Sequence, residues 1–545
     1  MKLKSRFLII FLLLIASIPL MDLFHPGIPI THDGPDHVAR IANFYQSLSE
    51  GNIIPRWAAN LNWGFGHPIL MFLYPLSSYI SSFFHFVGFS FVDSTKLVFA
   101  VAFVASVLAM FVWAQAQWGA LSGIIAALLY GFAPYRFVDL YVRGAIGEHM
   151  AFVFPPLVLY GLFMLAKKGM FGKWVMFTSL SMAGLIVSHN AVSLMFLPVI
   201  VLYIIYLYVF ETKQEKMFII FSIASIFLGF ILSAFFWIPA LFEGKYTLRD
   251  IVTKGDFKNR FAPLSWFFYS PWNYGIGVEF SKSLGFFQWI AVAGGLITFW
   301  KSKDKKIRWM IVFNALILIG SIFLMTSSSF VLWQRISLLQ KFQFPWRLLT
   351  LAVFASSVLG AIVASIIPKK FSLVTIIISF LFVFGTTHPM WHSKAYSAKP
   401  EEYYTGIYDS TTDTGESSPI WSTRFMEKRA ASPIEIIDGS ATVVPLLKKS
   451  TRHEYAIVAQ TKTRLVENTL YFPGWTVQSD GKLVPIEFQD QQYRGLMTFW
   501  VEPGRHSILI TFTDTRLRTL ANILSLVGLG LLFISAIIPV WKRIK

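Results

Sequence analysis

The sequence predicts a polytopic α-helical membrane protein with about 12 transmembrane helices and an extracytoplasmic antiparallel β-domain near its carboxyl terminus. Three observations support this prediction. Hydrophobic residues make up 55% of the 545 residues and charged residues only 14%, a composition typical of integral membrane proteins. Apolar segments of bilayer length recur along the chain, and many basic residues lie in short loops between them. One long stretch before the last apolar segment has the pattern of short strands separated by turns.

Twelve apolar segments are long enough, at about 20 residues, to cross a bilayer. The first, residues 5–22, follows Lys2, Lys4 and Arg6, so the amino terminus is expected to stay in the cytoplasm. No clear small-x-small cleavage site follows it, which favours an uncleaved span over a signal peptide. The other predicted spans are 96–114, 118–133, 149–166, 174–189, 192–210, 218–240, 286–300, 309–326, 347–367, 371–388 and 518–540.

The formal net charge of +18 indicates membrane topology and not a nucleic-acid partner. Many Lys and Arg residues lie in the short loops 167–173, 211–217, 301–308 and 368–370, as the positive-inside rule describes for cytoplasmic loops. The basic tail 541–545 should lie on the same side, so we expect a multi-pass protein of the cytoplasmic (plasma) membrane with both termini inside. The absence of cysteine excludes disulfides, thiolate metal sites and cysteine nucleophiles.

Residues 67–90 are apolar enough for another span, but two prolines and several serines interrupt them. This mixture favours an interfacial or re-entrant helix pair on the outer surface. A true span is the alternative. It would require another helix to be miscounted, because orientation demands an even number of spans between residues 22 and 149. We therefore expect a multi-span domain over 1–388, with its first outer loop at 23–95.

Residues 389–517 form the one substantial soluble region. Turn signals at 479–481 and 502–504 separate stretches rich in β-branched and aromatic residues. We expect a small antiparallel sandwich held between the last two spans, followed by the final span and a cytoplasmic tail over 518–545. The candidate strands are 454–459, 496–501 and 506–512.

The most informative polar segment is residues 31–37, just beyond the first span. Asp33 and Asp36 are three residues apart, so a turn can bring both carboxylates near one point. A carboxylate there could deprotonate an acceptor hydroxyl or hold a divalent cation against a phosphate, and His32 and His37 add ligands or proton carriers. Asp33, Asp36 and His37 are therefore the metal candidates, and the metal itself is left open. The alternative is a polar loop whose Asp and Gly only make a turn.

A second polar group lies within residues 135–149. Arg136 and Arg143 could bind phosphate oxygens, and Glu148 could support either arginine or a metal. The alternative is a loop whose arginines contact lipid headgroups. These residues alone do not decide between the two interpretations.

Three further motifs carry polar or aromatic side chains. His189, at the outer end of a predicted span, is expected to face the protein interior, where it binds substrate or joins helices by hydrogen bonds. Arg347 ends the motif Gln343–Arg347, and it either binds a lipid phosphate or snorkels to the interface. The motif Tyr471–Trp475 is expected to make a structural turn, with saccharide binding as the alternative. No P-loop, Rossmann, serine-hydrolase or zinc-protease motif occurs, so we expect no nucleotide-powered mechanism.

Taken in order, these motifs resemble the bacterial and archaeal membrane proteins called 6-pyruvoyl-tetrahydropterin synthase-related, with a carboxy-terminal part similar to YfhO-type membrane proteins. Nothing in the sequence suggests pterin chemistry. The architecture also resembles the GT-C glycosyltransferase superfamily. That resemblance implies a polyprenyl-phosphate sugar as donor, and Asp33 or Asp36 as the catalytic carboxylate. The matching segments are 32–37, 139–144, 188–190, 343–347 and 471–475.

We therefore expect a GT-C-like, inverting glycosyltransferase that moves a sugar from a polyprenyl-phosphate donor to a glycan or protein acceptor of the envelope, on the extracytoplasmic face. Asp33 or Asp36 would activate the acceptor, and arginines would hold the donor phosphate at the membrane lipid surface. The lipid phosphate would leave without any nucleotide. The candidate substrate-binding residues are His32, His37, Arg136, Arg143, Glu148, His189 and Arg347.

Two other classes of function compete with this expectation. A transporter or flippase for lipid-linked saccharides would place functional charges near the bilayer midplane, often within inverted repeats. The distinctive polar groups here gather at one face and no repeat is evident, so this class ranks second. The third is a non-catalytic protein that binds or assembles envelope polysaccharide through its β-domain.

Overall fold

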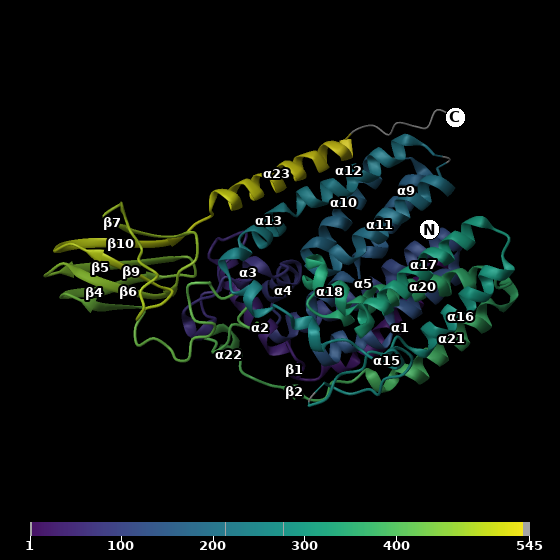
Figure 1. Cartoon of the computed structure of the whole chain (residues 1–545), viewed down its shortest axis with the longest axis horizontal. Coiled ribbons are helices and arrows are strands. Elements are labelled where there is room, and N and C mark those ends of the chain that lie inside the picture. Colours follow the sequence, from purple (N-terminus) through teal and green to yellow (C-terminus); the bar gives the residue numbers. More distant parts are fainter. Residues whose placement is uncertain (1–2, 170, 213, 276, 538–545) are drawn as a thin grey trace.

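The computed structural model describes residues 3–169, 171–212, 214–275 and 277–537. It consists of a helical bundle with a β-domain at one end (Figure 1). Lys2, Lys213 and the tail 541–545, which contributed to the expected topology, lie outside the described residues, as do the side chains of Lys4 and Arg6.

The bundle is built from long apolar helices. They bury much of their surface against one another, and the outer helices keep many large apolar side chains exposed, as a bilayer requires. The main helices are α1 (Leu3–Ser17), α5 (Phe91–Trp118), α6 (Ala120–Gly131), α9 (Phe154–Lys168), α10 (Phe171–Ser188), α11 (Asn190–Phe210), α12 (Lys216–Leu232), α13 (Ala234–Phe242), α16 (Phe286–Lys301), α17 (Lys305–Met325), α20 (Leu349–Ser365), α21 (Ser372–Thr387) and α23 (Arg516–Ile537).

Helices occur at each of the twelve predicted spans, but fewer of them meet the length and apolarity of a membrane crossing. Among the described residues, eight helices do so, or up to ten if each of two bent pairs is one span. One bent pair joins α6 to residues 134–143 at 49°, and the other joins α12 to α13 at 70°. The two predicted spans outside these ten, 174–189 and 286–300, lie in α10 and α16, which have 18 and 16 residues.

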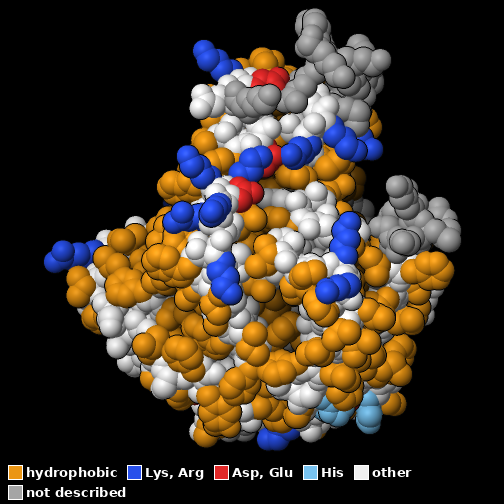
Figure 2. All heavy atoms as spheres, turned by 90° about the vertical axis from the view of Figure 1, so that its right-hand side faces the viewer, with side chains coloured by type: hydrophobic (Ala, Val, Ile, Leu, Met, Phe, Trp, Pro, Cys, Tyr) orange, Lys and Arg blue, Asp and Glu red, His pale blue; other side chains and the backbone are white. Residues whose placement is uncertain are grey.

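The basic loops and the β-domain lie at opposite ends of the molecule. Figure 2 shows the end away from the β-domain, where Lys and Arg side chains gather. Three of these loops meet directly, because Lys167 and Lys306 both pair with Glu211, with Lys306 Nζ 3.0 Å from Glu211 Oε1. The separation of basic loops from the β-domain matches the expected topology, and the side of the membrane that each end faces stays a prediction.

The first loop contains α2 (Gly34–Ser49), α3 (Ile69–Phe72) and α4 (Leu76–Phe86). Residues 67–90 thus form two short helices, with no helix of bilayer length. Helix α4 turns its polar face inward and exposes apolar rings such as Phe86, which is 76% exposed. The structure therefore favours the helix pair over a further span. The serines that α4 buries are Ser77, Ser78, Ser81 and Ser82.

The β-domain is an antiparallel sandwich, as predicted. A five-stranded sheet in the order β4-β5-β10-β7-β8 and a three-stranded sheet in the order β3-β6-β9 contribute to one apolar core. The two-residue turn Asp480-Gly481 joins β7 to β8 with φ of 52° and 79°, the left-handed conformation that tight hairpins require. The strands are β3 (Ile434–Asp438), β4 (Ala441–Lys448), β5 (Arg452–Ala459), β6 (Thr463–Leu470), β7 (Trp475–Ser479), β8 (Lys482–Val484), β9 (Leu496–Val501) and β10 (Gly504–Phe512).

The three predicted strands are confirmed as β5, β9 and β10. Residues 391–433, which the sequence assigned to the β-domain, precede the first strand of the sandwich and contact both the bundle and the β-domain. We call this segment the strap. Its strand β2 (Tyr396–Ser397) pairs with β1 (Ile28–Pro29) in the first loop, and its helix α22 (Glu402–Thr405) packs against α2.

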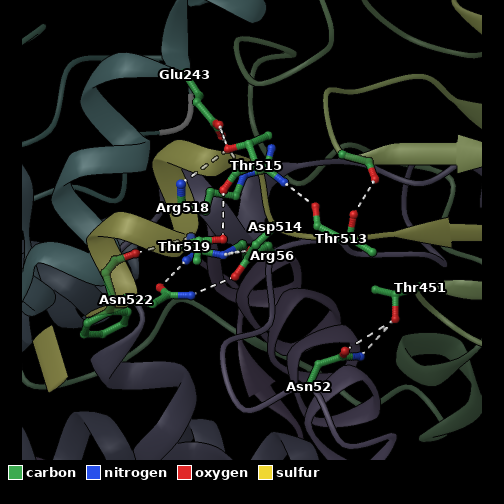
Figure 3. Close-up of polar contacts among 12 residues, drawn as sticks. Asn52, Arg56, Glu243, Thr451, Thr513, Asp514, Thr515, Arg518, Thr519 and Asn522 are labelled. Carbon is green, nitrogen blue, oxygen red and sulfur yellow. Dashed lines mark hydrogen bonds and ion pairs between the residues drawn. The ribbon is translucent and has the colours of Figure 1, made fainter. Parts of the chain in front are cut away.

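A buried ionic network joins the β-domain and the last helix to the bundle (Figure 3). Arg518 Nε lies 2.7 Å from Glu243 Oε2, and both side chains are almost fully buried. Arg56 Nε lies 3.1 Å from Asp514 Oδ1, and its Nη2 donates to Asn522 Oδ1. The network therefore ties α13, the first loop and the start of α23 together.

Candidate functional site

The first two predicted polar motifs are in direct contact. The backbone amides of His32 and Asp33 donate to the carbonyls of Val142 and Arg143, each at 3.0 Å. Gly144 lies beneath them at φ +66°, and a Cβ there would approach the Thr31 hydroxyl to 2.3 Å. Only glycine suits this position. Gly144 therefore allows residues 31–37 to pack closely on residues 135–149.

Asp36 lies in the first turn of α2 and is half-buried. Its Oδ1 accepts a hydrogen bond of 3.0 Å from the Tyr408 hydroxyl of the strap, while no described contact occupies its Oδ2. Burial raises the pKa of Asp36 above its ordinary value, against the opposing effects of Arg40 and Tyr408. Asp33, at the N-cap of the same helix, is exposed.

Arg40 links α2 to the strap. Its Nε donates to the Thr412 hydroxyl at 3.2 Å, and its Nη2 donates to the Thr412 carbonyl. Its Nη1 donates to His37 Nδ1 at 3.0 Å, because a guanidinium has no acceptor. Burial first, and then Arg40, keep the pKa of His37 well below its ordinary value.

Asp33, Asp36 and His37 do not form a three-ligand metal site, and a cation held there together with a phosphate stays a prediction. Within the described residues, no group of three or more His, Asp or Glu side chains could hold a metal ion. The Nδ1 of His37 is already occupied by the cationic Arg40, and such a charge repels a metal ion.

Glu148 is the centre of a buried charged cluster, which we call the Glu148 cluster. It lies in α8 (Ile146–Ala151), and its Oε2 is 2.9 Å from Arg143 Nη1. The same guanidinium nitrogen is 2.7 Å from Asp139 Oδ1, and the Tyr135 hydroxyl donates to Glu148 Oε1 at 2.5 Å. Asp139 and Arg143 lie on η3 (Val138–Arg143), a π-helical turn that ends at Gly144, and such turns often occur at functional sites.

Arg347 reaches the same cluster from another part of the chain. It lies in η7 (Pro345–Leu348), directly before α20, with its Nε 3.7 Å from Glu148 Oε2. Its Nη1 donates to the Phe342 carbonyl at 3.0 Å and to Gln343 Oε1 at 3.1 Å. Within the described residues no contact uses Nη2, and the side chain keeps 13% of its surface exposed.

Tyr74 connects the Glu148 cluster to the α2 side of the site. Its ring packs over Gly147, where a Cβ would lie 2.0 Å from the ring, and stacks on His189 at 5.0 Å. It also lines a small pocket that includes His37 and Arg40. The predicted residues on either side of Tyr74 therefore share one region.

Two candidates lie apart from this group. Arg136 is completely buried, donates from Nη2 to the Ser106 hydroxyl at 2.8 Å and lies 4.0 Å above the Phe152 ring. His32 is exposed, with its ring against Gly275 and 6.2 Å from Phe280.

The motif Tyr471–Trp475 has a structural role. Trp475 is buried and packs on Trp57 of the first loop, with ring centroids 5.4 Å apart. Gly474 has φ +118°, and the Pro473 carbonyl accepts a hydrogen bond from Arg518 Nη2. The predicted turn is confirmed, and the buried indole is closed to a saccharide.

Sequence reasoning missed Arg40, Tyr74, Tyr135, Tyr408 and Thr412. Arg40 had a local signal, because it follows Asp36 by one helical turn and so lies on the same helix face. Tyr408 and Thr412 had none, because both contacts cross 372 positions of sequence.

No protein-family model matches the chain. An uncharacterised protein of Lactococcus lactis subsp. cremoris (strain MG1363) is 26% identical over 291 residues, which cover 50% of this chain and 45% of that relative. The match therefore extends over less than half of the relative's length. None of the comparisons supports the pterin synthase-related or YfhO-type resemblance.

Solved structures of three proteins are similar in part. Arabinofuranosyltransferase AftD from Mycobacteria is 17% identical, with a TM-score of 0.43 over 72% of this chain and 28% of its own. ArnT from Cupriavidus metallidurans, bound to undecaprenyl phosphate, is 12% identical, with a TM-score of 0.42 over 71% and 64% of the two chains. The oligosaccharyltransferase of Archaeoglobus fulgidus is 12% identical, with a TM-score of 0.43 over 76% and 60%.

Proposed function

We propose that the chain is a membrane glycosyltransferase that transfers a sugar from a polyprenyl-phosphate donor to an envelope acceptor on the extracytoplasmic face. The observation that carries the proposal is the convergence of a half-buried carboxylate and an arginine cluster in one region of a helical bundle. Transfer from a lipid-linked donor needs both groups near the membrane surface, because the carboxylate must accept the proton of the acceptor and the arginine must bind the donor phosphate.

Asp36 is the general base of this proposal. Tyr408 holds one of its carboxylate oxygens, so the other has a defined direction. Its raised pKa brings its basicity closer to the working pH, which favours proton abstraction. The Oδ2 atom takes the proton of the acceptor hydroxyl as the acceptor oxygen bonds to the anomeric carbon. The bond from that carbon to the phosphate oxygen breaks, and the polyprenyl phosphate leaves.

Arg347 is the proposed phosphate-binding residue. Arg143 lies between Asp139 and Glu148, so two carboxylates already compensate its charge. Arg347 has one longer contact of 3.7 Å to Glu148, and none of the described residues contacts its Nη2. Glu148 then orients Arg347 but does not fully compensate its positive charge, because the same carboxylate also pairs with Arg143. The proposal makes no use of Arg136, because its complete burial against α5 excludes a phosphate.

The test is transfer of labelled sugar from a panel of polyprenyl-phosphate sugars by the purified full-length chain. Asp36→Asn is expected to lower turnover by about 100-fold or more, the contribution typical of a general base, with the fold retained. Asp33→Asn is the matched variant on the same helix end, and we expect it to lower turnover by less than about 10-fold, because this exposed residue lacks the held geometry.

Three results would overturn parts of this proposal. Full activity of Asp36→Asn would remove the general base, and loss of activity in Asp33→Asn alone would move that role to Asp33. If the wild-type chain transfers no sugar but moves labelled lipid-linked saccharide across vesicle membranes, the proposed function would change from a glycosyltransferase to a flippase.

A further inference from the structure

We infer that the strap is part of the active site, and that Tyr408 and Arg40 are positioning residues that fix the orientation and charge state of Asp36. This inference rests on the proposed function and extends it to residues far from the acidic motif. The strap leads from α21 into the β-domain, so the placement of that domain would also determine the geometry of the carboxylate.

Backbone hydrogen bonds hold Tyr408 on the first loop from both sides. Its amide donates to the Asn60 carbonyl at 2.8 Å, and its own carbonyl accepts from the Trp63 amide at 3.0 Å. The Asn62 amide donates to the Ser410 carbonyl at 2.8 Å. These hydrogen bonds fix the backbone of Tyr408, so its hydroxyl is held in place beside Asp36. A residue that positions a catalytic group must itself be held in this way.

The contacts between the strap and the first loop use unusual backbone conformations. Asn62, Trp63 and Thr412 have φ of 54°, 63° and 62°, the left-handed region that bulky and β-branched residues seldom occupy. Thr412 presents both its hydroxyl and its carbonyl to Arg40 in this conformation. Such outliers persist where surrounding contacts demand them, and they cluster at functional sites.

The charges around Asp36 come from two elements. On α2 it faces Arg40 and Asp33, and on the strap it faces Asp413 and the Tyr408 hydroxyl. Arg40 and Tyr408 favour the ionised carboxylate, whereas burial and the two neighbouring aspartates favour the neutral acid. Removal of either favourable group leaves the opposing effects in place. The base would then be protonated at a higher pH, and the acid limb of the pH–rate profile would move upward.

The test is the pH–rate profile of Tyr408→Phe in the full-length chain. Loss of the hydroxyl alone is expected to move the acid limb of kcat upward by about one pH unit, with KM for the donor unchanged. Tyr493→Phe removes a phenol of the β-domain that has no described hydrogen bond and should leave the profile unaltered. Arg40→Gln, which removes the positive charge, should move the acid limb of kcat upward as well. This variant tests the positioning role if Tyr408→Phe does not fold.

The two proposals fail in different ways. A folded Tyr408→Phe or Arg40→Gln protein whose acid limb coincides with that of the wild type overturns the positioning role, while the transferase assignment stands. An upward shift of equal size in Tyr493→Phe also overturns it, because the effect would then be general. A wild type without transfer activity, or an Asp36→Asn variant with full activity, overturns the proposed function and this inference with it.

Discussion

Arg143 and Glu148 form an ion pair of 2.9 Å across the turn at Gly144, and both side chains are buried. The ion pair links the end of η3 to α8. Glu148 also accepts hydrogen bonds from Tyr135 and from the Thr350 hydroxyl at 3.2 Å. One carboxylate thus joins three parts of the chain, and its two oxygens are fully used. The pair is consequently both a structural element and the support of Arg347.

The first prediction concerns the loss of this carboxylate. Glu148→Gln leaves Arg143 with Asp139 as its one remaining carboxylate partner and leaves Arg347 with none in the cluster. Removing one member of a buried ion pair typically costs about 3–5 kcal/mol, and we expect about 3 kcal/mol here because Asp139 remains. Thermal unfolding of the purified chain measures the loss. Glu502→Gln breaks an exposed pair with Lys462 and should change stability by less than about 1 kcal/mol. Equal stabilities of the two variants would contradict the prediction.

The second prediction concerns Arg347. Arg347→Ala should weaken donor binding by about 10- to 100-fold, since a charge-assisted hydrogen bond contributes about 1.5–3 kcal/mol. Arg347→Lys should recover part of the affinity, because the ammonium keeps the charge but lacks the planar fork. Binding of a polyprenyl phosphate without sugar measures the effect. Arg335 is an exposed arginine shortly before Arg347 in the chain, and Arg335→Ala should bind the lipid as the wild type does. A comparable loss of affinity in Arg335→Ala would show that overall surface charge, and not a site at Arg347, binds the lipid.

Local patterns in the sequence predicted the elements of this fold and much of the site. Apolar length and basic loops located the helices, and alternation with turn residues located β5, β9 and β10. The contact between Asp33 and Arg143 followed from no pattern, yet both residues had been singled out because their side chains suit phosphate and proton chemistry. Residues that were chosen for the chemistry of their side chains therefore proved to be neighbours in the structure.

The remainder depends on contacts between distant segments. The strap has the composition of a soluble loop, so its assignment to the β-domain was natural, and its pairing with Ile28–Pro29 has no local signal. The span count was uncertain for a related reason. Whether a break such as that between α12 and α13 bends a helix by 70° is decided by the helices packed around it. The complete burial of Arg136 likewise depends on Ser106 of α5 and on Phe152 in the turn between α8 and α9.

The third prediction concerns pH and stability. His37 and His67 are buried, and burial is the main reason that the pKa of each lies below its ordinary value of 6.5. Below pH 6.5 the unfolded chain gains protons that the native state does not, so stability is lost as the pH falls. Each histidine contributes up to about 1.4 kcal/mol per pH unit. The difference in unfolding free energy between pH 7 and pH 5.5 should therefore shrink in His37→Asn/His67→Asn, and an unchanged difference would contradict the prediction.

The fourth prediction concerns the network in Figure 3, where Arg518 reaches Glu243 from the start of α23. Arg518→Met leaves a buried carboxylate without its cation and should cost about 3 kcal/mol or more. The β-domain should then detach at a lower temperature. The temperature of thermal unfolding of the purified full-length chain measures the loss.

A second substitution separates the loss of the ion pair from the loss of packing. Glu243→Gln added to Arg518→Met removes the unpaired charge, so the double variant should be more stable than Arg518→Met alone. Arg516→Met, at an exposed arginine on the same helix, should unfold as the wild type does. If the double variant is as stable as Arg518→Met, the arginine acts through its packing against Phe472 and Phe512. The charge of Glu243 would then play no part in holding the β-domain.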